Sequence, residues 1–129
     1  MQPRDRSILD FPALRRIVGA AFSPDGRVLA TTSTDGTITL WDTATGEMRK
    51  RFLCPMQYSG APVFSGDGRR LAIASETISV FDVPTGALRW EIRPTLGGHH
   101  TTAFALSPDG RLLLAGGGDP GRIHAWRLE

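Results

Sequence analysis

A four-residue turn signal recurs in this chain at a constant interval of 42 residues. The three copies lie at Ser23–Gly26, Ser65–Gly68 and Ser107–Gly110. Each copy ends in Asp-Gly, in which the Asp side chain can hydrogen-bond to nearby backbone and the Gly can take the positive φ of a tight turn. Repetition at this period is typical of stacked units that bury apolar surface against their neighbours. We therefore expect a repeat array rather than a domain with one central core.

The first unit contains four strand-like segments joined by turns. These segments are Ile17–Phe22, Val28–Ala30, Thr37–Asp42 and Met48–Leu53. The third of them alternates β-branched, apolar and aromatic residues with a period of two, which predicts a strand. Four antiparallel strands joined by tight turns form one blade of a β-propeller. Because no segment has a 3.6-residue apolar period, the predicted fold class is all-β.

The second and third units repeat this pattern with changes. In the second unit the predicted strands include Val63–Phe64, Leu71–Ala74, Thr77–Asp82 and Leu88–Trp90; in the third they include Leu112–Ala115 and Arg122–Trp126, with no fourth strand. Gly66 stands where the other two turns have proline. The glycine enlarges the unfolded ensemble, and we expect this exchange to cost roughly 0.4–1 kcal/mol of stability.

An aromatic residue closes the third strand of every unit. Trp41, Phe81 and Trp126 occupy this position, and Asp follows the first two. Together with Asp35-Gly36 and the repeated turn, these motifs resemble the WD40-repeat family over residues 17–129. The resemblance implies about three four-stranded antiparallel WD40-type blades that form an open arc or partial propeller. It also implies a structural role for six residues: Asp35, Trp41, Asp42, Phe81, Asp82 and Trp126.

The resemblance predicts one repeat domain over residues 1–129, with repeats at about 17–53, 59–93 and 99–129. Residues 6–11 are strand-like and are a candidate closing strand. Propellers typically have 4–8 blades, so three blades should not close into a ring within one chain. We expect exposed outer faces on units one and three, at Ile38 and Leu40 and at Ile123 and Ala125. A self-assembling short propeller and a piece of a longer one both remain open at this point.

The resemblance implies a non-catalytic scaffold that binds a protein or peptide partner through loops on one face. The loop residues that would form this face are Arg15, Arg16, Gln57, Tyr58, Glu76, His99, His100 and Asp119. Tyr, Arg and His are residue types that often dominate binding energy, although the same residues can also be ordinary solvated loop residues. The alternative function is a regulatory or structural propeller fragment of a larger multidomain enzyme.

Other functions find little support in the residues. Fifteen basic and thirteen acidic residues give a net charge of +2, too small an excess to indicate nucleic-acid binding. The run Gly116–Gly121 fits G-x-G-x-x-G, but no helix can follow it, so we interpret it as a widened hairpin turn. The adjacent histidines 99 and 100 cannot easily share one metal. We expect no enzyme activity, cofactor, small-molecule substrate or membrane span, and the lone Cys54 favours the cytoplasm.

Overall fold

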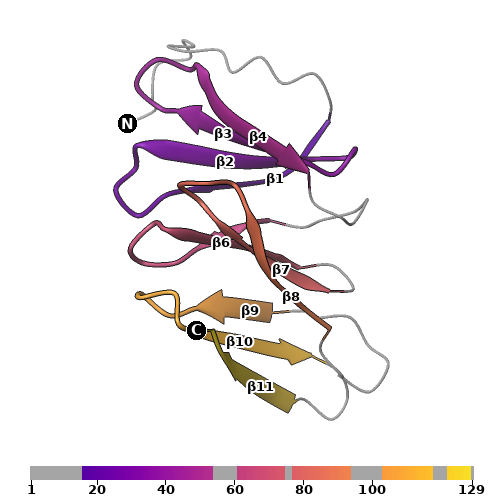
Figure 1. Ribbon diagram of the computed structural model, residues 1–129. Helices are drawn as coiled ribbons and strands as arrows, with labels where there is room; N and C mark the ends of the chain where they lie inside the picture. Colours follow the sequence, from indigo (N-terminus) through magenta and orange to yellow (C-terminus); the bar gives the residue numbers. More distant parts are fainter. Residues whose placement is uncertain (1–15, 54–60, 75–76, 94–102, 118–121, 129) are drawn as a thin grey trace, which may run out of the picture.

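The computed structural model describes residues 16–53, 61–74, 77–93, 103–117 and 122–128. Within these ranges the chain forms eleven strands and no helix (Figure 1). The strands make three separate antiparallel sheets that follow one another in chain order. The prediction of all-β, WD40-type blades is confirmed. Among the described residues, no helix has the length and apolarity needed to cross a bilayer.

Each sheet is built from strands that are neighbours in sequence. The first sheet has the order β1-β2-β3-β4, the second β5-β6-β7-β8 and the third β11-β10-β9. The strand bounds are β1 Ile17–Phe22, β2 Val28–Ser33, β3 Thr37–Asp42, β4 Met48–Leu53, β5 Val63–Phe64, β6 Arg70–Ala74, β7 Ile78–Asp82, β8 Leu88–Ile92, β9 Ala103–Leu106, β10 Leu112–Gly117 and β11 Arg122–Arg127. Within the described ranges, the third sheet therefore has β11 as an edge strand where the other two sheets have a fourth strand.

The three sheets share one register. Leu29 lies opposite Trp41, Leu71 opposite Phe81, and Leu113 opposite Trp126 in their respective sheets. Because side chains on a strand alternate between faces, each sheet has two different faces. Corresponding positions of the three repeats lie on the same face in all three sheets. We call the face that carries this Leu and aromatic pair the leading face. We call the opposite face, which carries Ala30, Ile38 and Leu40 in the first sheet, the trailing face.

Two apolar cores form where a trailing face meets the next leading face. Between the first and second sheets the fully buried members are Ala30, Ile38, Leu40, Leu71, Ile73 and Phe81. Between the second and third sheets they are Ala72, Ile78, Val80, Leu113, Ala115 and Leu128. The rings of Phe52 and Phe81 lie 4.9 Å apart across the first boundary. Each sheet is therefore stabilised by its neighbours, as the repeat pattern predicted.

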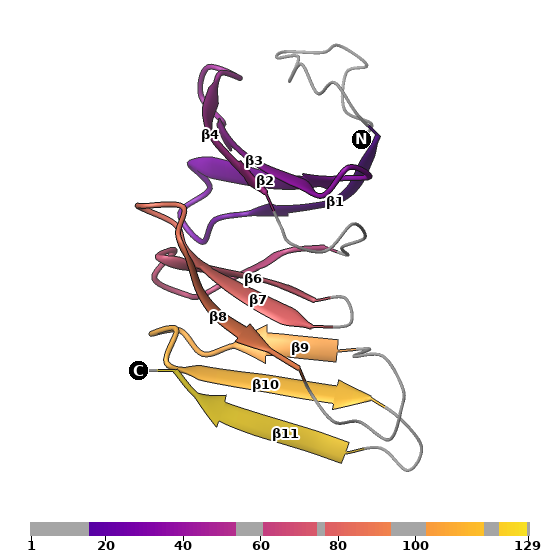
Figure 2. The same cartoon turned by 45° about the vertical axis from the view of Figure 1, so that its right-hand side comes forward.

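The sheets lie in a row, with the second between the other two (Figures 1 and 2). Strand β5 approaches both β1 and β9, so the first strands of the three sheets are the ones whose backbones meet. The described residues do not close into a ring, and one face at each end of the row has no sheet against it (Figure 2). The predicted open arc is confirmed.

One expectation about these end faces is wrong. Ile38 and Leu40 are 0% and 4% exposed, because they lie on the trailing face of the first sheet and pack against the second. The outer face of the first sheet is instead its leading face, with Leu29 and Trp41. In the third sheet the expectation was right, since Ile123 is 80% exposed and Ala125 is also exposed. The sequence pattern gave the alternation but not the direction in which the sheets stack.

Candidate partner-binding surfaces

The repeated turns lie along one edge of the row of sheets and are held by the same hydrogen bonds in all three copies. In the first copy, the Ser23 hydroxyl donates to Oδ1 of Asp25 at 2.6 Å, and the backbone N–H of Arg27 donates to the same oxygen at 3.0 Å. The glycine that follows has φ of 73°, in the region that other residues avoid. The turn edge is therefore a rigid frame for the side chains that project from it.

These hydrogen bonds stabilise the charged form of the turn carboxylates. The hydroxyls of Ser23 and Ser65 lower the pKa of Asp25 and Asp67 below the ordinary value of 3.8, with a further contribution from the N–H two residues on. For Asp109 the backbone N–H of Arg111 is the largest cause of a lowered pKa. A hydrogen bond to a carboxylate favours its ionised state. All three turns therefore carry a negative charge at neutral pH.

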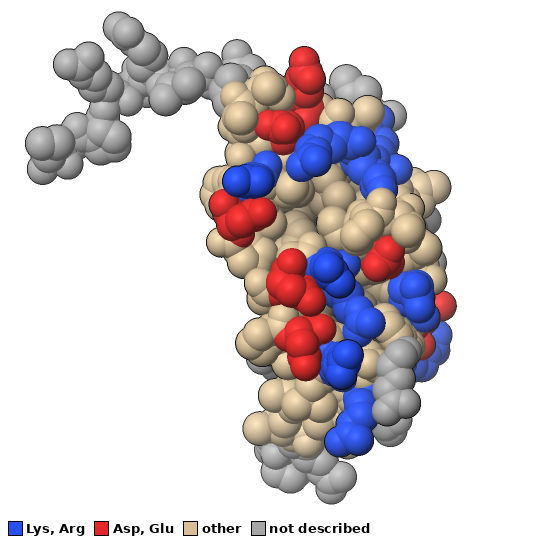
Figure 3. All heavy atoms as spheres, turned by 60° about the vertical axis from the view of Figure 1, so that its left-hand side comes forward, with Lys and Arg blue, Asp and Glu red and all other residues tan. Residues whose placement is uncertain are grey.

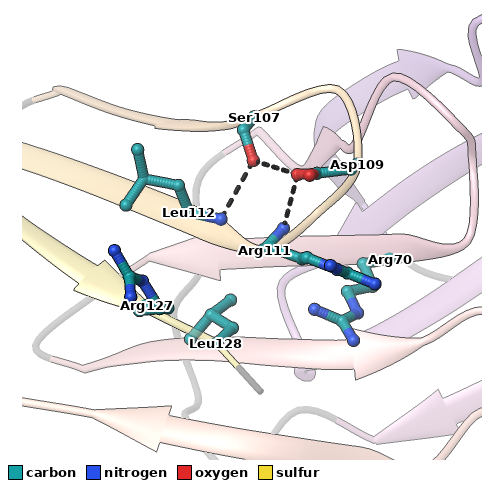
Figure 4. Close-up of a pocket in the computed structure, with 7 residues that line it drawn as sticks. All are labelled: Arg70, Ser107, Asp109, Arg111, Leu112, Arg127 and Leu128. Carbon is teal, nitrogen blue, oxygen red and sulfur yellow. Dashed lines mark hydrogen bonds between the residues drawn. The ribbon is translucent and has the colours of Figure 1, made fainter.

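An open groove of about 790 Å³ lies beside the third of these turns. The residues that line it come from the second and third sheets (Figure 4): Arg70, Ser107, Asp109, Arg111, Leu112, Arg127 and Leu128. Three arginines and one carboxylate thus border the same space. The net charge of the groove lining is therefore positive.

Arg70 is the fixed member of this groove. Its guanidinium donates to the carbonyl oxygen of Gly110 and lies 4.6 Å from the centre of the Trp90 ring. The first contact ties the second sheet to the turn of the third, and the second holds the cation over an aromatic face. Arg70 is therefore preorganised, and its remaining N–H groups can donate to a ligand in the groove.

Arg111 and Arg127 are the available members. In the described part of the chain, neither guanidinium makes a hydrogen bond or an ion pair, although the charge of Arg111 contributes to the lowered pKa of Asp109. Both side chains are exposed. A planar guanidinium with five donors pairs well with carboxylate or phosphate oxygens. The groove can therefore accept an anionic group from a partner.

Basic side chains extend beyond the groove. Figure 3 shows Lys and Arg in a band along the turn-bearing side of the molecule, with Asp and Glu beside it. Part of this band comes from the repeat itself, because an Arg follows the turn glycine in every unit, at positions 27, 69 and 111. Sequence reasoning considered only the small net charge of +2 and missed the groove. The recurrence of Arg after the turn was the signal that could have indicated it.

Most of the predicted partner-binding residues lie outside the described residues. This applies to Arg15, Gln57, Tyr58, Glu76, His99, His100 and Asp119. Arg16 is described: it is exposed at the start of β1, and its carbonyl oxygen accepts a hydrogen bond from the N–H of Thr34 at 3.0 Å. This places Arg16 beside the β2–β3 turn, at the opposite edge from the arginine groove. The predicted binding face stays a prediction.

The residues with a predicted structural role are all described. Trp41 and Phe81 are 2% and 1% exposed, and the indole N–H of Trp41 donates to Oγ1 of Thr31 at 2.9 Å. Trp126 is half-buried at the second boundary and stacks on the ring of His124, with centroids 5.8 Å apart. The three remaining carboxylates accept hydrogen bonds in turns, from partners that include Ser33 for Asp35, Ala44 for Asp42 and Thr85 for Asp82.

No cluster of three or more His, Cys, Asp or Glu side chains among the described residues could hold a metal ion. His124 is the one histidine that the structure describes, and it packs on Trp126 in β11. The electrostatic feature that remains is the arginine groove.

The sheets, the turns and the aromatic register together define a protein built of propeller blades. The family model described as "WD domain, G-beta repeat" matches residues 13–42 and 90–127. These segments make up more than half of the chain. The chain belongs to the WD40-repeat family. Repeats of this family generally act as protein-interaction scaffolds and are generally non-catalytic.

Three similar proteins illustrate the range of this family. Human apoptotic protease-activating factor 1 is 34% identical over 95 residues, which cover 63% of this chain and 7% of that protein. An uncharacterized WD repeat-containing protein of Synechocystis is 34% identical over 113 residues, covering 85% of this chain and 31% of that protein. Small ribosomal subunit protein RACK1y of Oryza sativa subsp. japonica is 29% identical over 119 residues, covering 84% of this chain and 34% of that protein. The chain thus spans about a third or less of each.

Proposed function

We propose that this chain is a non-catalytic protein-interaction module that binds an acidic segment of a partner in the arginine groove. The observation that carries the proposal is the pair of exposed guanidiniums of Arg111 and Arg127, which make no hydrogen bond or ion pair with the described residues, beside the fixed guanidinium of Arg70. Charge-assisted hydrogen bonds to carboxylates are among the stronger polar contacts in proteins. Asp109 also lines the groove, and its negative charge repels a ligand carboxylate at that position. It therefore helps to fix how the acidic segment lies in the groove.

Partner binding at Arg16 and the other predicted loop residues is a second part of the proposal. So is self-association of chains to complete a ring. Family membership supports both, since WD40 repeats generally act as scaffolds. The lone Cys54 is our reason to place the protein in a reducing compartment, the cytoplasm.

Fluorescence anisotropy with a labelled peptide that contains six consecutive glutamates tests the acidic-segment proposal. We expect saturable binding that weakens with salt, because the groove is open to solvent. The double variant Arg111→Ala/Arg127→Ala should bind at least roughly tenfold more weakly, since each hydrogen bond to a charged group is worth about 1.5–3 kcal/mol and about 1.4 kcal/mol is a factor of ten. Arg51→Ala is the matched control, because Arg51 is an exposed arginine of β4 that does not line the groove. Equal losses in both variants would show that the binding is only general charge attraction.

A second candidate function is a regulatory or structural part of a larger multidomain protein. The observation that favours it is the short span of the match, which covers 7% of the human relative and 34% of the rice relative. The mass of the protein isolated from its natural source distinguishes the two. A product much heavier than 14.0 kDa after denaturation would support the second candidate.

A further inference from the structure

The trailing face of the third sheet has no covering sheet, although the same positions are buried twice elsewhere in the molecule. In the first sheet Ala30, Ile38 and Leu40 are at most 4% exposed, and in the second Ala72, Ile78 and Val80 are 0% exposed. The equivalent residues of the third sheet are Leu114, Ile123 and Ala125. Leu114 is 39% exposed and Ile123 is 80% exposed. Apolar surface of this kind marks an interaction site.

The two existing boundaries show what kind of surface covers such a face. In both, a trailing face packs against a leading face that carries a Leu and an aromatic side chain opposite one another. A third apolar side chain from the first strand of that sheet joins the contact: Phe64 at one boundary and Leu106 at the other. The occupant that fits the third sheet is therefore the leading face of another blade of this type.

The first sheet has such a leading face, and it is partly free. Phe22 pairs with Leu29 exactly where Phe64 pairs with Leu71 and Leu106 pairs with Leu113. Phe64 and Leu106 are half-buried by their neighbours, whereas Phe22 is 65% exposed. Trp41 on the same face is already covered within the chain, at 2% exposed. The free part of this leading face is thus the half formed by β1 and β2, around Phe22.

We infer that a second copy of this chain docks the Phe22 half of its first sheet onto the Ile123 face of the third sheet. This inference deepens the proposed self-association and so rests on the proposed role as an interaction module. The contact joins two different surfaces, so it is head-to-tail, and the assembly as a whole keeps one free face of each kind until a ring closes. It reproduces, between chains, the part of the internal boundary that involves the first strand of a leading face, where Phe64 and Leu106 lie at the two existing boundaries.

Light scattering after size exclusion at micromolar concentration tests this with three single substitutions. Ile123→Glu places a charge on the trailing face and Phe22→Glu places one on the leading face. Leu88→Glu is the control, because Leu88 is 41% exposed on β8 of the middle sheet and belongs to neither end face. All three side chains are partly or largely exposed, and circular dichroism with thermal unfolding confirms that each variant is folded.

We expect the natural sequence and Leu88→Glu to have the mass of two or more chains, and each end-face variant alone to have the mass of one. An equimolar mixture of the two end-face variants should give dimers that grow no further, because only one intact interface remains. A monomeric natural chain overturns the inference. Assembly of Phe22→Glu alone also overturns it, because this would indicate contact between two identical faces. A mixture of the two end-face variants that stays monomeric overturns it as well.

The same Phe22→Glu protein separates this inference from the arginine-groove proposal. Its substitution lies in the first sheet, while the groove lies between the second and third. If Phe22→Glu and the natural chain are both monomeric but bind the hexaglutamate peptide equally well, the docking inference fails and the groove proposal stands. If the natural chain assembles and Phe22→Glu is monomeric, but neither protein binds the peptide, the groove proposal fails and the docking inference stands.

Discussion

Gly66 is the position where a single methyl group should test the contact between the second and third sheets. A Cβ placed on Gly66 would lie 2.7 Å from Cα and 2.9 Å from Cβ of Pro108 in the next turn. Carbon atoms in van der Waals contact are about 3.5–4.0 Å apart. The N–H of the adjacent Asp67 donates to the carbonyl oxygen of Pro108 at 2.8 Å. The glycine therefore permits a close backbone approach that any side chain would prevent.

This geometry reverses the expectation from sequence alone. With an unstrained backbone, Gly66→Ala would stabilise the protein by roughly 0.4–1 kcal/mol through the unfolded state. Gly66 does not have a positive φ, so backbone conformation does not oppose the change. Overpacking against Pro108 costs about 1–3 kcal/mol, and it cannot be relieved by a rotamer because the contact is with backbone. Weakening of the Asp67 hydrogen bond adds about 0.5–1.5 kcal/mol. We expect a net loss of about 1–3 kcal/mol.

Urea unfolding followed by tryptophan fluorescence measures this loss, because Trp90 and Trp126 both lie at the boundary concerned. Pro24→Gly is the matched control, since Pro24 holds the equivalent position in the first turn and is exposed. That control should lose only roughly 0.4–1 kcal/mol, through the unfolded state. If Gly66→Ala is as stable as the natural chain, or more stable, the close approach to Pro108 does not exist and the reasoning is wrong.

Three further predictions concern the core, the turns and the first boundary. Trp41→Ala should cost on the order of 3–5 kcal/mol in urea unfolding, because a buried indole and its bond to Thr31 are lost; a loss under about 1 kcal/mol would place Trp41 on the surface. The lowered pKa values of Asp25, Asp67 and Asp109 mean that their stabilisation is fully present above the ordinary value of 3.8 and is lost as pH falls through the folded-state pKa. Unfolding free energy below this pH should therefore fall less steeply in the triple Asp→Asn variant than in the natural chain; parallel curves would contradict the assignment. Phe52→Ala should lower the free energy of unfolding in urea by less than the roughly 3–5 kcal/mol typical of a fully buried Phe. The reason is that the ring packs on Phe81 but is only half-buried.

The sequence was most informative where structure depends on neighbouring residues. The turn at Ser23–Gly26 and its two copies have the positive-φ glycine and the Asp hydrogen bonds that their residue types predict. The strand pattern of Thr37–Asp42 was also right, because alternation of side chains is a local property of the chain. Such features carry their own physical cause within a few residues, so no knowledge of the neighbouring sheet is needed.

Features that depend on distant residues could not be predicted in the same way. The face of the first sheet that carries Ile38 was assigned to the outside, because alternation gives two faces but does not say which one meets the next sheet. Gly66 was interpreted as the loss of a proline, because its contact with Pro108 joins residues in separate units. The arginine groove joins Arg70 of β6 with Arg111 and Arg127 of the third sheet. Each of these three features depends on how two sheets are placed relative to one another, which the sequence pattern does not specify.

The groove and the uncovered face at Ile123 both involve β11 in the described part of the third sheet. In the first two sheets, the third strand pairs with an outer strand, so β3 lies beside β4 and β7 beside β8. In the described third sheet β11 is itself the edge, although its end keeps the usual bond from the N–H of Leu128 to the carbonyl oxygen of Arg111, at 2.7 Å. Leu112 and Arg127 pair at this edge and line the groove, while Ile123 lies at the other end of the same strand. One strand therefore contributes to both a charged site and an apolar face, and a partner that covered both would need an acidic group about one strand length from an apolar surface.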